Sequence, residues 1–184
     1  MPYFLNQAKI DFKLRPILFI DLEMTGLDVE KHEIVEIAAL LVRPPKFEIE
    51  NSFYTKVIPT HPETGDPKSL KIINYHPKDW TEAIPLKQAL EELSQFAPNC
   101  FLAGWSVQNE WDFLNHALEK ENIPYFYKHQ LIEVFSLAYV HCYGDQDIKF
   151  LNLPNMAHKL GVHLDPHKPD SDIRATLEIF RKLI

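Results

Sequence analysis

The chain has 184 residues, 46% of them hydrophobic, and a formal net charge of -7. This length fills one core and is short for two, so we expect one domain over residues 1–184, with residues 1–15 as an N-terminal extension. The negative charge argues against wrapping duplex DNA through a broad basic surface. Nucleic acid is not excluded, because carboxylates gathered at one site would bind divalent cations that attract phosphate.

Cysteine usage and apolar runs indicate the compartment. Cys100 and Cys142 lie far apart without a C-x-x-C spacing, so neither a disulfide framework nor a thiolate zinc site is expected. No window reaches the roughly eighteen apolar residues that a membrane span requires. We therefore expect a soluble protein of the reducing cytoplasm, with no membrane partner.

Three apolar, β-branched runs predict strands in the first third of the chain, at Ile17–Leu22, Glu33–Val42 and Ser52–Ile58. Their short connections favour an antiparallel meander. Proline and glycine punctuate Pro59–Pro67, which predicts a loop. Apolar residues then recur at i, i+3, i+4 and i+7 over Leu86–Phe96, the pattern of a helix packed on one face.

The second half reads as one more strand among helices. Cys100–Trp105 predicts a buried strand. Helices are predicted at Asn109–Glu121, Gln130–His141, Asn155–Leu160 and from Ser171 or Asp172 to the end of the chain. Strands followed by a strand embedded among helices indicate an α/β domain with a mixed sheet and helices on both faces.

The peptide FIDLEMTGLD, residues 19–28, carries two acids at the end of the first predicted strand. Asp21 and Glu23 are two residues apart, so their side chains project to the same face. Two carboxylates on one face of an apolar strand repel each other and lose solvation, which bridging cations relieve. Taken alone, such a pair is more often a solvated strand end.

A second acidic feature lies near the end of the chain, where His167 precedes Asp172 by five residues at the start of an amphipathic helix. Each residue alone fits an ordinary role, a surface histidine or a helix N-cap. Together with the D-x-E pair, the spacing resembles the DEDDh family of 3′-5′ exonucleases, which includes polymerase proofreading domains and oligoribonuclease. The segments LEMTGLD and DIR look particularly like oligoribonuclease, and no tyrosine stands at the spacing of the DEDDy branch.

The resemblance implies an RNase H-like mixed sheet of about five strands, the first three antiparallel, with helices on both faces. It implies a metal-dependent 3′-5′ exonuclease domain that hydrolyses single-stranded DNA or short RNA to nucleoside 5′-monophosphates. Two alternatives stay open: oligoribonuclease proper, and a weakly active or inactive module that binds nucleic acid or protein. Because related families dimerise, a homodimer is also possible, although no residue identifies an interface.

The middle motif, LAGWSVQNEWDFL, departs from the family pattern. In the family a strand ending in glycine leads to a helical aspartate, with Phe-Leu three and four residues later. Counting from both sides places that position on Glu110, whereas Asp112 lies about 200° further round the helix. We predict Glu110 as the third acid, with weakened activity because its extra methylene alters metal coordination. Trp105 and Ser106 stand where the family has His-Asn, and Trp105 fits a core aromatic and a base-stacking residue equally well.

The resemblance also implies roles for these side chains. Asp21, Glu23, Glu110 and Asp172 would hold two Mg²⁺ or Mn²⁺ ions, which prefer oxygen ligands. His167 would take the proton of the attacking water, since an imidazole titrates near neutral pH.

The segment Met24–Gly26 would receive the terminal nucleotide. Gly26 would let the backbone approach the sugar, Thr25 would hydrogen-bond the 3′-hydroxyl, and Met24 would wedge against a base. The alternatives are core filling for Met24 and an ordinary turn for Thr25 and Gly26.

Overall fold

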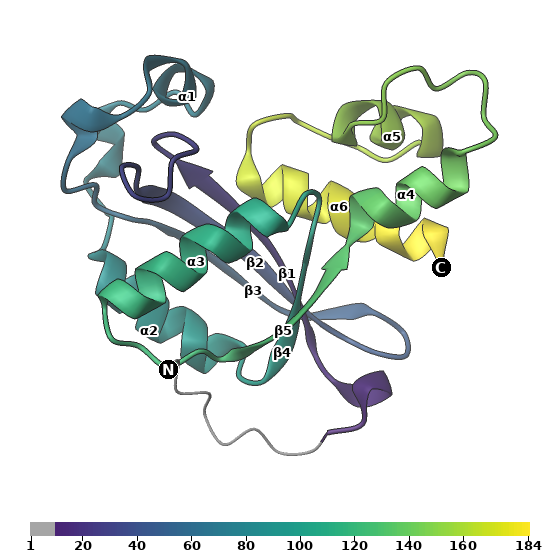
Figure 1. Cartoon of the computed structure of the whole chain (residues 1–184), viewed down its shortest axis with the longest axis horizontal. Helices are drawn as coiled ribbons and strands as arrows, with labels where there is room; N and C mark the ends of the chain where they lie inside the picture. Colours follow the sequence, from purple (N-terminus) through teal and green to yellow (C-terminus); the bar gives the residue numbers. More distant parts are fainter. Residues whose placement is uncertain (1–9) are drawn as a thin grey trace.

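A five-stranded mixed sheet in the order β3-β2-β1-β4-β5 forms the centre of the computed structural model, which describes residues 10–184 (Figure 1). The strands are β1 (Ile17–Met24), β2 (Ile34–Arg43), β3 (Glu48–Lys56), β4 (Cys100–Gly104) and β5 (Tyr127–Glu133). The pairs β1-β2 and β2-β3 are antiparallel, whereas β1-β4 and β4-β5 are parallel. This confirms the predicted mixed sheet with an antiparallel meander at its start.

Helices cover both faces of the sheet. They are α1 (Pro67–Ile72), α2 (Leu86–Phe96), α3 (Gln108–Lys120), α4 (Val134–Cys142), α5 (Leu153–Leu160) and α6 (Pro169–Leu183). Helices α2 and α3 pack on one face, and α6 lies against the other with α4 and α5 beside it (Figure 1). Within residues 10–184, no helix is long and apolar enough to cross a bilayer.

Alternation along β1 decides which helices each side chain meets. The even-numbered positions of Leu18–Leu22 belong to the core shared with α2 and α3. The odd-numbered Ile17 and Phe19 belong to the core shared with α6. Because successive strand residues point to opposite faces, the next odd positions, Asp21 and Glu23, also project toward the side of α6. The strand therefore changes from apolar to acidic on one face only.

The predicted helix over Gln130–His141 is wrong in its first part. Residues up to Glu133 form β5, and α4 begins only at Val134. The polar residues Lys128–Gln130 lack a strand-like apolar pattern, and they become extended because β5 pairs with the open edge of β4. Local sequence alone does not carry that tertiary pairing.

Strand β3 begins at Glu48, before the predicted start at Ser52. The added residues are exposed and include two glutamates, so they show no apolar run. They are extended because they pair with the end of β2, where Glu48 lies opposite Arg43.

Part of the expected N-terminal extension packs on the sheet. Residues 1–9 lie outside the described part of the chain, whereas Arg15 is 5% exposed. Its guanidinium donates to the backbone oxygen of Asn99 at 2.8 Å and stacks over the Phe101 ring. Arg15 thereby joins the start of β1 to the start of β4. The division of the chain into an extension and one domain stays a prediction.

Candidate active site

Three carboxylates from distant parts of the sequence meet at one point. Asp21 and Glu23 on β1 and Asp172 in the first turn of α6 each offer an oxygen, and these oxygens lie within 4.8 Å of one another. Across residues 10–184, no other group of three acids, histidines or cysteines is arranged to hold a metal ion. The two segments that the sequence singled out therefore converge.

A fourth acid comes from α3. Glu110 lies in the first turn of this helix and is 7% exposed. Its charge raises the pKa of Asp21, although its oxygens are not among those that lie within 4.8 Å of one another. Asp112 is exposed instead and accepts a hydrogen bond from Gln108 Nε2 at 3.0 Å. Of the two acids of the middle motif, Glu110 is thus the buried one, and the one whose charge acts on Asp21.

Burial and mutual repulsion make these carboxyls hard to ionise. The pKa of Asp21 lies well above its ordinary value, first because of burial and then because of Glu110, Glu23 and Asp172. Burial, followed by repulsion from Glu36 and Asp172, raises the pKa of Glu23 to about 7. Without a cation the cluster holds protons at neutral pH.

Glu110 and Asp172 add oxygens that lack partners. Burial, with repulsion from Glu133 and Glu23, raises the pKa of Glu110 to about 8. Its Oε2 atom and Oδ1 of Asp172 are buried and have no hydrogen-bond partner among the described residues. Carboxylate oxygens gathered without protein donors are the ligand set that hard divalent ions prefer, so the residues fit such ions.

Glu36 is an acid of this region that the sequence analysis missed. It lies opposite Glu23 on β2, is 7% exposed, and accepts a hydrogen bond from the Tyr54 hydroxyl at 2.6 Å. The available signal was a charged residue inside the otherwise apolar run IVEIAALLV. Glu133, at the end of β5, was missed because it fell inside the predicted helix.

His167 lies on an exposed turn immediately before α6. Its backbone N–H donates to Asp172 Oδ2 at 3.1 Å, which ties the turn to the acidic cluster. The backbone of His167 has a φ of 62°. The structure thus brings the histidine beside the acids, while its role as a base stays a prediction.

Comparison with known proteins identifies the family. The family model of the RNase T exonucleases matches residues 18–180. The chain belongs to the RNase T-like exonuclease family. This family consists of phosphodiester hydrolases of the DEDD type, in agreement with the resemblance of the motifs. No curated protein sequence matches the chain.

Solved structures of exonuclease I share its fold. E. coli exonuclease I in complex with a dA16 oligonucleotide matches with a TM-score of 0.76 at 14% identity, over 92% of this chain and 40% of that one. The zinc-bound E. coli ExoI–ssDNA complex gives a TM-score of 0.78 at 14% identity, over 91% and 40%. This exonuclease-family chain therefore spans about two fifths of their length. At such identity the likeness confirms the RNase H-like exonuclease fold.

The segment after the acidic pair is a closely packed bend. The Thr25 hydroxyl is buried and accepts a hydrogen bond from the N–H of Glu33 at 2.9 Å. A Cβ on Gly26 would lie 2.4 Å from the His32 ring, so only glycine allows this close approach. Met24 is partly buried and packs against the core. Contacts of these residues with a nucleotide stay predictions.

Trp105 is partly buried at the end of β4 and packs edge-on against Phe135. The ring centroids are 5.9 Å apart and the planes are perpendicular at 90°. This contact favours a packing role for the indole, and base stacking stays a prediction.

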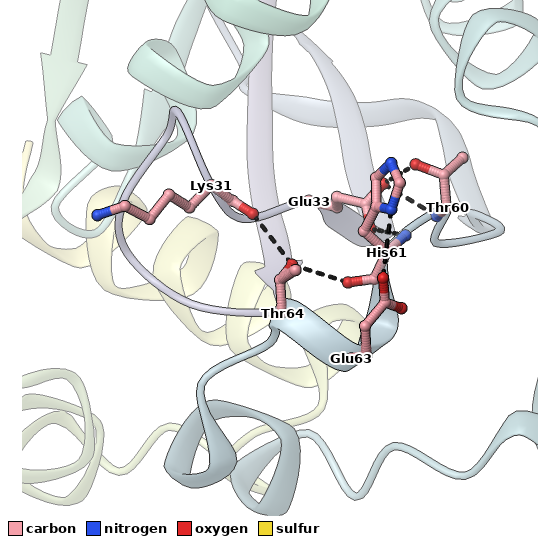
Figure 2. Close-up of polar contacts among 6 residues, drawn as sticks. All are labelled: Lys31, Glu33, Thr60, His61, Glu63 and Thr64. Carbon is pink, nitrogen blue, oxygen red and sulfur yellow. Dashed lines mark hydrogen bonds and ion pairs between the residues drawn. The ribbon is translucent and has the colours of Figure 1, made fainter.

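A carboxylate clamp fixes the loop that flanks the bend. Figure 2 shows Glu33 accepting hydrogen bonds from the backbone N–H of Thr60 at 2.9 Å and of His61 at 2.8 Å. The Thr64 hydroxyl bonds the carbonyl oxygens of His61 and Lys31. Residues 60–64 are thereby held against the segment that follows β1.

The raised pKa values predict that the metal-free protein loses stability as pH rises. Glu23 and Glu110 have pKa values of about 7 and about 8 when folded, against an ordinary value of 4.5. Between about pH 4.5 and 8 the folded state binds more protons than the unfolded state, so the free energy of unfolding falls with increasing pH. Thermal unfolding in EDTA measures this, and Mn²⁺ is expected to raise Tm more at pH 8 than at pH 5.

Two variants separate the effect of the buried acids on Tm from the effect of the protein's net charge. Glu110→Gln should raise the metal-free Tm at pH 8 relative to the natural chain and flatten the pH dependence. The exposed Asp112→Asn should leave both unchanged. Equal profiles for all three proteins would contradict the account of buried repulsion.

Proposed function

We propose that the chain is a metal-dependent 3′-5′ exonuclease that hydrolyses single-stranded DNA or short RNA to nucleoside 5′-monophosphates. The observation that carries this proposal is the convergence of oxygens of Asp21, Glu23 and Asp172 within 4.8 Å of one another. The buried Glu110, whose charge acts on Asp21, supplies the fourth acid of the proposal. Family membership supports the reaction class. The oligonucleotide complexes of exonuclease I support a single-stranded substrate.

We assign two Mg²⁺ or Mn²⁺ ions to Asp21, Glu23, Glu110 and Asp172. When bound, the ions supply positive charge that stabilises the attacking and leaving oxygens of the phosphodiester. Glu110 is suited to a ligand role because its Oε2 atom is buried without a protein donor. The acids of β1 are held on a central strand, so their separation is set by the sheet rather than by a loop.

His167 acts as the general base in this proposal. Its exposed position lets substrate and water reach the ring, and its backbone bond to Asp172 keeps the turn beside the acids. A neutral imidazole accepts the proton of the attacking water at physiological pH.

The bend at Met24–Gly26 receives the 3′-terminal nucleotide. The Thr25 hydroxyl accepts a hydrogen bond from the backbone N–H of Glu33, and its own hydrogen is left for the 3′-hydroxyl of the nucleotide. Leu27, which follows Gly26, is 77% exposed and offers an apolar surface to a base. Leu27 suits this contact better than Met24, because Met24 packs against the core. Trp105, which follows the last residue of β4, is assigned to the substrate side by the resemblance of its motif.

A second candidate function is a weakly active or inactive module that binds nucleic acid or protein. It is favoured by Glu110, where the family pattern has aspartate, and by Trp105-Ser106 in place of His-Asn. Oligoribonuclease proper, an enzyme limited to very short RNA, is a narrower form of the first proposal.

Two buried, unpaired cysteines, Cys100 and Cys142, support placement in the reducing cytoplasm. A homodimer stays a prediction.

The proposal is tested with a 5′-labelled single-stranded oligonucleotide, as DNA and as RNA, in Mg²⁺ or Mn²⁺. We expect stepwise shortening from the 3′ end, release of nucleoside 5′-monophosphates, and no reaction in EDTA or with Asp21→Asn. Folded protein that yields no product with either metal would reject the enzyme and favour the binding module. A dinucleotide cleaved much faster than a longer strand would select oligoribonuclease.

The third acid is tested by paired neutral variants on the same helix. Glu110→Gln should abolish most turnover, because Glu110 is buried and its charge acts on Asp21. Asp112→Asn should retain much of the turnover, because Asp112 is exposed. Rates at saturating Mn²⁺ measure the difference. The reverse order of activities would show that Asp112 is the ligand.

A further inference from the structure

Glu133 joins the turn before α3 to the start of α4. It is the last residue of β5, and its Oε1 atom accepts hydrogen bonds from the backbone N–H of Ser106 at 2.8 Å and of Phe135 at 3.0 Å. The second bond caps α4, as an acceptor at this position commonly does. The first bond crosses to a different segment, the turn between β4 and α3.

The parallel sheet makes this reach possible. Gly104, the last residue of β4, lies opposite Glu133, so the ends of β4 and β5 are adjacent. Ser106 follows in a left-handed conformation with a φ of 62°. Helix α3 then starts after Val107, which offers no side-chain cap. The turn is therefore fixed from outside, by the carboxylate of β5.

Glu110 depends on that turn for its direction. It lies in the first turn of α3, and its buried Oε2 atom has no hydrogen-bond partner among residues 10–184. The carboxyl is instead bonded by the N–H of its own residue, which counteracts part of the rise in its pKa. The start of α3 therefore sets where the carboxylate points.

We propose that Glu133 is a positioning residue, which fixes the Ser106 turn and thereby holds Glu110 against the metal-binding acids. This inference rests on the proposed function. Its Oε1 atom accepts from two backbone N–H groups, so Glu133 holds the backbone on both sides. Outer residues that orient metal ligands affect metal affinity strongly, by about 10–100-fold.

The test is Mn²⁺ binding to the purified full chain, measured by electron paramagnetic resonance of free Mn²⁺, together with the Mn²⁺ dependence of hydrolysis. Glu133→Ser keeps a short N-cap for α4 and loses the reach to Ser106. We expect it to weaken Mn²⁺ binding by about tenfold or more. Glu133→Gln keeps an oxygen acceptor for both N–H groups and should bind within about threefold of the natural chain.

Asn152→Ser provides a matched control. Asn152 caps α5 by accepting from the N–H of Asn155 at 2.8 Å, and this helix carries none of the four acids. This exchange of caps should leave Mn²⁺ binding unchanged. Glu110→Gln supplies the second control, because a residue that acts through Glu110 has little further effect once that carboxylate is neutral.

Three results would overturn the inference. Unchanged Mn²⁺ binding in Glu133→Ser would show that the turn does not need the carboxylate. An equal loss in Glu133→Gln would make the charge, not the positioning, the cause, and this variant decides the matter if Glu133→Ser does not fold. If Glu133→Ser weakens Mn²⁺ binding as much in the Glu110→Gln background as in the natural chain, Glu133 acts independently of Glu110. Failure of the natural chain to bind Mn²⁺ would instead reject the proposed function.

Discussion

Repulsion among carboxylates at the end of the central strand is the constraint on which the rest of the structure depends. The oxygens of Asp21, Glu23 and Asp172 lie within 4.8 Å of one another, and Glu110 adds a fourth negative group. Burial removes the water that would otherwise solvate them, which raises the pKa of each. Such a cluster is unfavourable by itself, and divalent cations are the partners that would relieve its repulsion. The scaffold must therefore hold the acids together against their own repulsion.

The acids of this region are of two kinds: those of the cluster, and those whose oxygens bond backbone N–H groups. Asp21 and Glu23 are carried by a strand whose apolar residues are buried on both faces, and Asp172 by a helix pinned through Phe180, which packs edge-on against Phe19. Other carboxylates near the site use their oxygens on backbone N–H groups, Glu33 on the loop after β3 and Glu133 on the turn before α3. Partnered acids thus fix the backbone, while unpartnered oxygens such as Glu110 Oε2 remain for a ligand.

Much of the fold could be predicted from local pattern. The central strands are strongly apolar and α2 has a clear helical period, so their positions follow from the sequence, and the acid pair of β1 follows from its place at a strand end. Strand β5 could not be predicted, because its polar residues become extended only by pairing with β4. Glu36 and Glu133 could not be recognised as part of this region, because their positions depend on strand pairing, with Glu23 and Gly104 respectively. The choice of Glu110 over Asp112 needed a register taken from a family pattern; the structure buries Glu110 and exposes Asp112, and the choice of the third ligand stays a prediction.

The most direct test of a shared metal centre is anomalous diffraction from a crystal soaked in Mn²⁺ at pH 8, where the carboxyls ionise most readily. The account predicts manganese peaks enclosed by Asp21, Glu23, Glu110 and Asp172, with the Glu110 carboxylate turned toward them. Clear diffraction with no peak at this position, or manganese bound only elsewhere on the surface, would contradict it.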